Sequence, residues 1–240
     1  MIQDIQPHQY DNRYQPQPPD RNSFVLYCEE HSVLVKQTPD GITFPRFSEL
    51  ERLNEDIYDD CIYLFSIDGM RYYLAENISR EPLSEFSMEN TEIFRGAEPQ
   101  YQAFAGITGY QLYIWYRDHK YCGRCGRLLE RDRKERMLRC GECGNMVYPK
   151  ICPAVIIGVT DGSRILMSKY AGRTYKKYAL LAGFAEIGET LEQTVKREVM
   201  EEVGLKVKNI RYYKSQPWSF SDTLLTGFYC DLDGPDEITL

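Results

Sequence analysis

Acidic residues gather at regular spacing between Gly183 and Leu205, where the chain reads GFAEIGETLEQTVKREVMEEVGL. Glu198, Glu201 and Glu202 stand three and four residues apart, so they share one edge of any helix that forms there. Like charges at this spacing repel one another, and a bound divalent cation removes that repulsion. All-oxygen ligands suit Mg²⁺ or Mn²⁺. The segment therefore predicts a divalent-metal site that can orient an attacking water molecule.

The element that must position these carboxylates is a helix over about residues 191–203. Thr190, followed three residues later by Gln193, has the pattern of a capping box, and Gly204 is a natural stop. Spacing also predicts an apolar stripe along one face, formed by Val195, Val199 and Val203. Arg197 stands where it can hold a carboxylate such as Glu189 through a bidentate pair.

The whole segment fits one spaced pattern and resembles the box of the Nudix hydrolases, GX5EX7REUXEEXGU with U apolar. The alternative is an ordinary acidic, solvated helix face. Seven fixed identities should coincide by chance in fewer than about one window in a million. The resemblance implies an α/β/α sandwich in which a metal neutralises a pyrophosphate. It also implies catalytic roles for Glu189, Arg197, Glu198, Glu201 and Glu202, and metal binding by these last three glutamates and the backbone carbonyl of Ala182.

Four cysteines form a second chemical cluster, with the spacing Cys122-x2-Cys125, fourteen residues, Cys140-x2-Cys143. This spacing is typical of a zinc site. Each Cys-Gly-x-Cys turn can direct two thiolates at one tetrahedral ion, which leaves no open position and predicts a structural zinc. Two disulfides are the alternative, and a reducing compartment disfavours them. The remaining cysteines stand among apolar residues and are expected to be buried thiols: Cys28, Cys61, Cys152 and Cys230.

Basic residues are frequent between the two cysteine pairs, in the stretch GRLLERDRKERMLR. Two interpretations stay open. The stretch is either a solvated rim of the zinc site or an electrostatic contact for a phosphate-rich substrate or an RNA chain.

Composition limits the protein classes that fit this chain. Its 240 residues are 42% hydrophobic and 27% charged, which is ordinary for a globular protein. The net charge of −7 argues against a protein whose main task is to hold nucleic acid through its phosphates. No apolar run is long enough to span a membrane, and the polar start MIQDIQPHQYDN lacks the apolar region of a signal peptide. These features predict a cytoplasmic protein without a membrane partner.

Hydrophobic patterning predicts a mixed α+β chain with four parts. Residues 1–105 form a small β-rich N-terminal domain, 106–121 a linker helix, 122–150 the zinc ribbon and 151–240 the Nudix domain. The linker helix should run from about Ile107 to His119, with His119 in a packing or helix-end role because the cysteines already supply four zinc ligands. In the last part, short strands are expected at 154–159, 164–168, 178–181, 210–214 and 224–230.

Two further segments make the resemblance narrower. Tyr148-Pro149-Lys150 follows the ribbon, and residues 215–223 read SQPWSFSDT. Both are similar to the NADH pyrophosphatase branch of the Nudix family, whose downstream motif is SQPWPFPxS. This chain departs from that motif at Ser219, Ser221 and Thr223. The resemblance implies substrate contacts from Arg95, Glu135, Tyr148, Phe184, Ser215, Gln216, Pro217, Trp218, Ser219, Phe220, Ser221, Asp222 and Thr223.

The resemblance implies hydrolysis of NADH or NAD⁺ to nicotinamide mononucleotide and AMP, and removal of NAD caps from RNA. It also implies a homodimer, catalytic Mg²⁺ or Mn²⁺, and structural Zn²⁺. Two alternatives stay open: a Nudix hydrolase of another dinucleotide such as ADP-ribose, and a catalytically weak Nudix-fold binding module. The sequence ends at Leu240, ahead of the acidic segment, last strand and helix of that branch. It therefore predicts a Nudix fold that is truncated at its C-terminal end.

Overall fold

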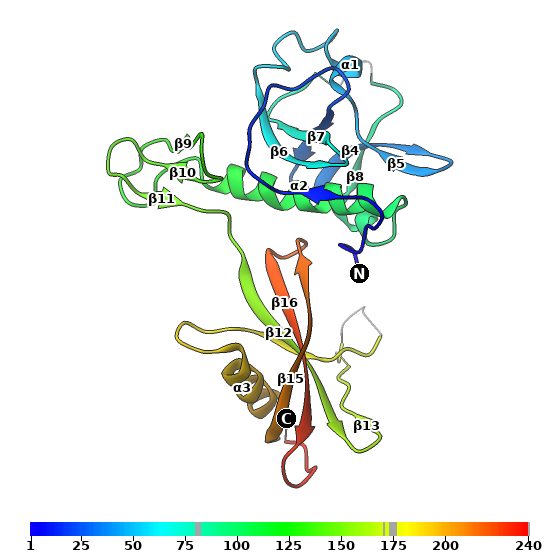
Figure 1. Cartoon of the computed structure of the whole chain (residues 1–240), viewed down its shortest axis with the longest axis vertical. Coiled ribbons are helices and arrows are strands. Elements are labelled where there is room, and N and C mark those ends of the chain that lie inside the picture. Colours follow the sequence, from blue (N-terminus) through cyan, green and yellow to red (C-terminus); the bar gives the residue numbers. More distant parts are fainter. Residues whose placement is uncertain (80–82, 170, 173–176, 240) are drawn as a thin grey trace. The chain divides into compact units, whose positions relative to one another are not determined.

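The computed structural model describes residues 1–79, 83–169, 171–172 and 177–239. The chain divides into two compact units, Met1–Lys150 and Ile151–Leu240, whose elements are labelled in Figure 1. Within the described ranges, no helix combines the length and the apolar character that crossing a membrane requires.

The described residues of the first unit form two four-stranded sheets besides the small sheet of the ribbon. One has the strand order β1-β6-β7-β2, built from β1 (Tyr10–Asp11), β6 (Cys61–Ile67), β7 (Met70–Ala75) and β2 (Phe24–Leu26). The other is centred on β4 (Ser32–Thr38), which pairs with β3 (Cys28–Glu29), β5 (Gly41–Thr43) and β8 (Ser87–Asn90). Asp68 and Gly69 join β6 to β7 with φ values of 52° and 75°. Both lie in the left-handed region that a tight hairpin turn requires.

Helix α2 (Gln100–Asp118) packs against the sheets of the first unit. It begins well before Ile107, so the predicted start of this helix was wrong. Gly106 and Gly109 weaken the helical pattern in the sequence, but the fold needs them. A Cβ on Gly106 would lie 2.4 Å from the ring of Phe94, and a Cβ on Gly109 would lie 2.2 Å from Leu26. Both glycines therefore let the helix approach its neighbours closely.

The end of α2 confirms the structural role predicted for His119. This residue caps the helix, and its Nδ1 donates to the backbone oxygen of Trp115 at 2.8 Å. Two shorter helices complete the unit, α1 (Phe47–Leu50) and the 3-10 helix η1 (Thr91–Arg95). The ribbon adds a small sheet with the order β11-β10-β9, made of β9 (Glu130–Arg131), β10 (Leu138–Arg139) and β11 (Met146–Val147).

The second unit is a mixed sheet with one long helix beside it (Figure 1). The strand order is β13-β12-β16-β15, with β14 pairing the first half of β12. The bounds are β12 (Cys152–Asp161), β13 (Arg164–Ile165), β14 (Leu181–Phe184), β15 (Val207–Trp218) and β16 (Thr223–Leu232). Helix α3 (Leu191–Val203) is the one helix in the described residues of this unit. Its packed face meets Val155 and Ile157 of β12 and Phe228 of β16 in one apolar core.

All the strands described in the second unit differ from their predicted bounds, and β13 ends at Ile165 rather than at Ser168. β14 begins at Leu181 rather than at Tyr178, and β15 continues to Trp218 instead of ending at Lys214. Pro217 lies inside β15, which pairs along one side with β16 within the described sheet order. An edge strand tolerates proline because its outer N–H has no sheet partner to lose. The alternating pattern alone therefore predicted a strand that is shorter than β15.

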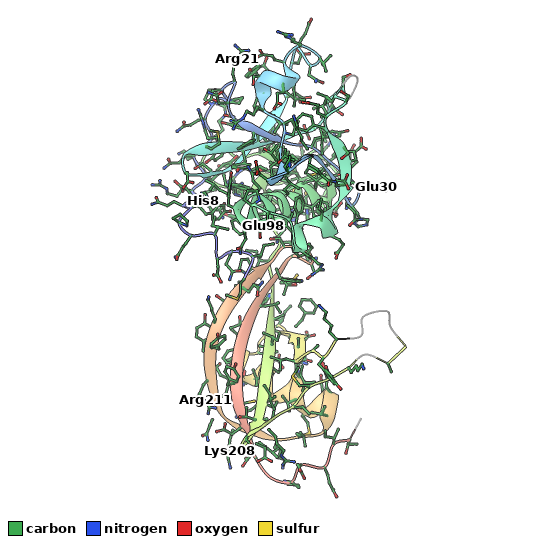
Figure 2. All side chains as sticks on the ribbon, turned by 90° about the vertical axis from the view of Figure 1, so that its right-hand side faces the viewer. His8, Arg21, Glu30, Glu98, Lys208 and Arg211 are labelled. Carbon is green, nitrogen blue, oxygen red and sulfur yellow. The ribbon has the colours of Figure 1, made fainter. Side chains whose placement is uncertain are left out.

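Charged side chains lie along the outer strand of this sheet, where Figure 2 labels Lys208 and Arg211. Lys208 Nζ pairs with Asp233 at 2.9 Å, and Arg211 Nη2 pairs with Asp231 at 2.9 Å. Charge on an edge strand discourages pairing with the edge of another sheet.

Candidate active site and zinc centre

Helix α3 has the predicted ends. The side chain of Thr190 accepts from the backbone N–H of Gln193 at 3.2 Å, and Gln193 Oε1 accepts from the N–H of Thr190 at 2.8 Å. Gly204 ends the helix with a φ of 70°, in the left-handed region that glycine adopts without strain. The predicted stripe is buried: Val195 and Val199 are 0% exposed and Val203 is 5% exposed. The glutamates therefore have a fixed helical frame.

Arg197 connects the parts of the box. Its Nε and Nη2 donate to the two carboxylate oxygens of Glu189 at 2.7 and 3.0 Å, as the sequence predicted. Its Nη1 donates to Glu198 at 2.7 Å and to Glu201 at 2.9 Å. Nη2 also donates to the backbone oxygen of Phe184 at 2.8 Å. One guanidinium thus joins strand β14, the loop after it and helix α3.

Glu189 is surrounded by donors. Besides the Arg197 guanidinium, the hydroxyl of Thr194 lies 2.9 Å from Glu189 Oε2, and the backbone N–H of Glu186 lies 3.1 Å from the same oxygen. Hydrogen bonds from Arg197 first, and then from Glu186 N–H, lower the pKa of Glu189 to about 2. This carboxylate stays ionised, and its lone pairs are occupied. The geometry favours a positioning role for Glu189 over proton transfer.

A missing side chain makes room for Glu198. A Cβ built on Gly183 would lie 1.9 Å from the carboxyl carbon of Glu198 and about as close to both oxygens. The Glu198 side chain is only 12% exposed. In the ladder of β14 with β12, Ala182 pairs with Ile156 directly before this glycine. The backbone oxygen of Ala182 and the carboxylate of Glu198 therefore come from neighbouring parts of one site.

Glu202 lies one turn of the helix after Glu198. Desolvation raises the pKa of Glu202, and the negative charge of Glu198 raises it further. A carboxylate whose ionisation is disfavoured by burial and by a neighbouring negative charge is an expected neighbour of a divalent cation. Carboxylates and a carbonyl also form the all-oxygen donor set that hard cations prefer. The donor chemistry fits such an ion, although Glu198 and Glu201 both face Arg197 here.

The motif residues 215–223 form a hairpin at one end of the sheet. Ser215, Gln216, Pro217 and Trp218 belong to β15, and Thr223 begins β16. The rings of Trp218 and Phe220 lie 5.1 Å apart. Asp222 has a φ of 54° and completes the reversal.

Hydrogen bonds close this hairpin where the family motif has prolines. The N–H of Ser221 donates to Trp218 O at 3.2 Å, and the hydroxyls of Ser221 and Thr223 lie 2.9 Å apart. Thr223 Oγ1 also lies 2.9 Å from Ser221 O. Ser219 is buried at 7% exposure. The departures from the motif therefore exchange the fixed backbone angle of proline for side-chain hydrogen bonds.

Three of the predicted substrate residues lie in the first unit. Tyr148 is 53% exposed, and its hydroxyl donates to Glu135 Oε2 at 3.0 Å. That hydrogen bond raises the pKa of Tyr148. Arg95 ends η1 and pairs with Glu92. The fourth aromatic candidate, Phe184, lies on β14 of the second unit and is 54% exposed.

Four cysteines form the zinc centre. The sulfur atoms of Cys122, Cys125, Cys140 and Cys143 all lie within 4.8 Å of one another. Within the described ranges, this is the one group of three or more His, Cys, Asp or Glu side chains that brings its ligand atoms so close. The glutamates of α3 do not form such a group. Soft thiolates at tetrahedral spacing suit Zn²⁺.

Two turns of the same design hold the sulfur atoms. The N–H of Cys122 donates to Arg127 O at 2.7 Å, and that of Gly126 donates to Cys122 O at 2.8 Å. In the second turn, the N–H of Cys140 donates to Asn145 O at 2.8 Å, and that of Gly144 donates to Cys140 O at 3.0 Å. Gly126 and Gly144 have φ values of 74° and 69°, where a side chain would be strained.

Hydrogen bonding lowers the pKa of two of the four cysteine thiols, those of Cys122 and Cys140. The backbone N–H of Arg124 lies 3.4 Å from Cys122 Sγ and lowers the pKa of that thiol to about 6. The N–H of Cys143 likewise lowers the pKa of Cys140. The backbone N–H of Arg127 acts on Cys125 in the same direction, but the hydrogen bonds to the other three cysteines and desolvation together outweigh it, and the pKa of Cys125 rises to about 12. Neighbouring sulfur atoms resist joint ionisation, which a bound cation would relieve.

Both parts of this arrangement match known domain families. Residues 150–238 match the NUDIX domain, and residues 117–148 match the NADH pyrophosphatase zinc ribbon domain. The chain therefore contains a NUDIX domain preceded by an NADH pyrophosphatase zinc ribbon domain. This confirms the predicted fold class, a mixed α+β chain with a zinc ribbon ahead of a Nudix domain. The ribbon match and the cysteine cluster together identify a structural zinc site.

Curated relatives of this zinc-ribbon Nudix chain carry the name NAD-capped RNA hydrolase NudC. The protein of Enterobacter sp. (strain 638) is 46% identical over 130 residues, which is 54% of this chain and 50% of that protein. That of Shigella dysenteriae serotype 1 (strain Sd197) is 45% identical over 54% of this chain and 51% of its own length. The chain therefore spans about half the length of these relatives. A NUDIX hydrolase crystal structure from Nitrosomonas europaea aligns with a TM-score of 0.42 at 28% identity, covering 49% of this chain and 69% of that one.

Several groups around the Nudix box were not predicted. The hydroxyl of Thr194, the N–H of Glu186 and the carbonyl of Phe184 all serve the Arg197–Glu189 pair. Thr194 carried a weak signal, because it lies four residues after the N-cap Thr190 on the face that turns inward. The residue types at Glu186 and Phe184 do not indicate that their backbone groups take part.

Proposed function

We propose that this chain carries a metal-dependent NAD(H) diphosphatase, which hydrolyses NADH or NAD⁺ to nicotinamide mononucleotide and AMP. The observation that carries the proposal is the assembled box. Arg197 holds Glu189, Glu198 and Glu201 in one network, and Gly183 leaves room for the carboxylate of Glu198. Supporting it, the curated relatives that match this chain are named as NAD-capped RNA hydrolases.

The proposed metal ligands are Glu198, Glu201, Glu202 and the backbone oxygen of Ala182. Mg²⁺ or Mn²⁺, when bound, supplies charge neutralisation for the pyrophosphate and a more acidic water. The residues of the chain hold this site in shape. Glu189 and Arg197 fix the loop against the helix. Desolvation, and then the charge of Glu198, raise the pKa of Glu202, an effect that a bound cation would oppose.

Substrate recognition is proposed for the residues that the motifs indicated. The hairpin of residues 215–223 provides the ring of Trp218, and the exposed faces of Tyr148 and Phe184 suit stacking on a base. Glu135 and Arg95 add charged groups. Because aromatic stacking accepts any base, it suits a dinucleotide with two different rings.

The same proposal includes removal of NAD caps from RNA, a homodimer and a cytoplasmic location. The basic stretch of the ribbon is consistent with RNA as part of the substrate. A second candidate function is hydrolysis of another dinucleotide such as ADP-ribose. Its support is the departure of Ser219, Ser221 and Thr223 from the motif of the NADH pyrophosphatase branch.

Product analysis tests this proposal. The protein is incubated with NADH, NAD⁺ or ADP-ribose in the presence of Mg²⁺ or Mn²⁺, and the products are separated. Nicotinamide mononucleotide and AMP from NADH are the expected result. Glu202→Gln should abolish turnover with the fold intact, whereas Glu192→Gln, an exposed acid in the first turn of the same helix, should keep the rate. Faster cleavage of ADP-ribose than of NADH would favour the second candidate, and no cleavage of any substrate would reject both.

A further inference from the structure

A cavity of about 790 Å³ lies inside the first unit, where the zinc ribbon meets strand β6 and the end of helix α2. We refer to it as the ribbon cavity. None of its lining residues belongs to the box or to the hairpin of residues 215–223. Its volume is within the range of pockets that hold small organic ligands, about 300–1,000 Å³.

The walls of the ribbon cavity are fixed by contacts between the ribbon and the rest of the first unit. The hydroxyl of Tyr14 donates to Asp132 O at 3.2 Å. Arg136 reaches from the ribbon to the backbone oxygen of Leu64 and, at 3.2 Å, to Asn12 Oδ1. These contacts anchor the ribbon to β6 and to the N-terminal segment, so the cavity belongs to the folded unit.

Aromatic and aliphatic groups form one side of the ribbon cavity. Tyr14 and Tyr63 are half-buried and Tyr116 is buried, and each lines the space. Leu128 and Leu138 of the ribbon also line it. Ring faces and aliphatic groups at this spacing suit a planar ring as the ligand.

Cations provide the polar side. Lys120, Arg131 and Arg133 line the ribbon cavity, and in the part of the chain that the structure describes none of the three forms an ion pair. Behind the rings, Arg136 lies 5.1 Å from the centroid of Tyr14 and bonds neutral acceptors. The positive charge of Arg131 acts on Cys61, Tyr14 and Tyr116, where it opposes the rise in pKa that burial causes.

Three acids also line this space, equal in number to the cations. Asp132 accepts from the backbone N–H groups of Lys134 and Glu135 at 2.8 and 3.0 Å and lies 3.8 Å from Arg139. Its charge is therefore occupied by its own turn. Glu76 and Glu130 remain against Lys120, Arg131, Arg133 and the nearby Arg136. Among the described residues, Lys120, Arg131 and Arg133 are thus cations without an ion pair in a cavity that aromatic rings also line.

We propose that the ribbon cavity binds a nucleoside monophosphate unit, with the base against the tyrosines and the phosphate at Arg131 and Lys120. The tyrosines suit a planar ring and the cations suit an anion, so a ligand that joins these two groups fits the cavity. The unit can come from a free nucleotide or from a nucleotide within an RNA chain. This site is separate from the proposed active site, so it stands whether or not the chain hydrolyses NADH.

The first experiment measures binding to the full chain by calorimetry with no added Mg²⁺ or Mn²⁺. The probes are AMP, adenosine, inorganic phosphate and a short oligoadenylate. AMP should bind more tightly than adenosine or phosphate, because each of these offers one of the two groups. Tighter binding of the oligoadenylate than of AMP identifies RNA as the source, and equal or weaker binding identifies the free nucleotide. No binding of either AMP or the oligoadenylate at millimolar concentration would overturn the proposal.

A matched pair of variants assigns the binding to the ribbon cavity. Arg131→Gln should weaken AMP binding by about tenfold, the scale of one charge-assisted hydrogen bond. Arg127→Gln removes an equally exposed arginine of the same ribbon that does not line the cavity, and it should bind AMP like the parent. The zinc content of each variant reports whether its ribbon is folded. Equal effects of the two substitutions would contradict the assignment.

Hydrogen exchange with AMP present separates this site from the active site. The expected result is slower exchange in β6 and β9, which the Arg131→Gln substitution reduces. Protection confined to β14, α3 and the hairpin of residues 215–223 would show that AMP binds only at the proposed active site, and the inference would fail. The NADH hydrolysis rate of Arg131→Gln should equal that of the parent, which keeps the two proposals distinguishable.

Discussion

At the scale of single residues, Gly183 and Glu198 depend on each other. The glycine has no side chain at the point where the carboxylate lies, and an added Cβ would meet the carboxyl carbon at 1.9 Å. That atom belongs to a group held by Arg197 at 2.7 Å, so it cannot move freely. The size of residue 183 therefore controls the position of a proposed metal ligand.

Gly183→Ala should displace Glu198 and weaken both metal binding and hydrolysis, each by about tenfold or more, since misplacement by about 1 Å can cost a hundredfold in rate. Manganese binding measured by titration and the rate of NADH hydrolysis report the two effects. Gly96→Ala is a suitable control, because nothing lies within 4 Å of the added Cβ. If Gly183→Ala binds manganese like the parent, the carboxylate has another position available and the spatial argument is wrong.

The ionisation of Glu189 makes the stability of the fold depend on pH. Its pKa in the folded chain is about 2, below its ordinary value of 4.5. A lowered pKa means that the ionised form stabilises the fold, so this contribution is present above about pH 4.5 and is lost as the pH falls toward 2. In denaturant unfolding, the free energy of unfolding of the second unit should fall as the pH is lowered from about 4.5 toward 2. Glu189→Gln should flatten that part of the profile, and an unchanged slope would contradict the assignment to Glu189.

At the scale of elements, helix α3 was predictable because its signals are local. The capping box of Thr190 and Gln193, the valine stripe and Gly204 all act within a few residues of the helix. The start of α2 was not predictable in this way. Gly106 and Gly109 lower helix propensity, and they are present because Phe94 and Leu26 approach the helix axis. A contact between distant parts of the chain thus overrode the local pattern.

The same difference between local signals and contacts of distant residues applies to the candidate active site. The sequence predicted the pair between Arg197 and Glu189, because the family resemblance and the spacing both point to it. It did not predict that Thr194 and the N–H of Glu186 share the same carboxylate. It also placed the motif of residues 215–223 in a loop, whereas Gln216, Pro217 and Trp218 extend β15. The pairing of these residues with β16 is a tertiary property that strand propensity does not encode.

The cap of α3 gives a test at this scale. Thr190→Ala removes the side-chain acceptor for Gln193 N–H and should lower the free energy of unfolding of the second unit by about 1 kcal/mol. Thr190→Ser keeps the acceptor and should be close to the parent. Chemical denaturation of the three proteins provides the comparison. Equal stability of all three would show that this end of the helix is held by its packing alone.

At the scale of the whole molecule, the two units have separate cores and separate chemistry. The zinc centre belongs to the first unit, and the apolar core under α3 belongs to the second. The ribbon strands are two residues long, too short to be stable without additional support. The stability of the ribbon therefore depends on the metal more than on its sheet.

Cys140→Ser should abolish zinc binding and unfold the ribbon, because structural zinc contributes its binding energy to folding. Elemental analysis should fall from one zinc per chain to none, and hydrogen exchange should accelerate in β9, β10 and β11. Exchange within α3 should stay slow. Cys152→Ser changes a cysteine outside the zinc set and should retain the metal. A Cys140→Ser protein that keeps its zinc, or whose ribbon stays protected, would refute the assignment.

The ribbon cavity lies between walls that only a folded ribbon can supply, and this makes zinc and the cavity ligand reciprocal effectors. Whatever zinc adds to the affinity for a nucleotide, the nucleotide must add in equal measure to the affinity for zinc. A saturating nucleotide should therefore slow the removal of zinc by a chelator. Under zinc limitation, the metal would be retained longest by those copies of the protein that hold a ligand, so the nucleotide supply would influence how the metal is shared among the copies.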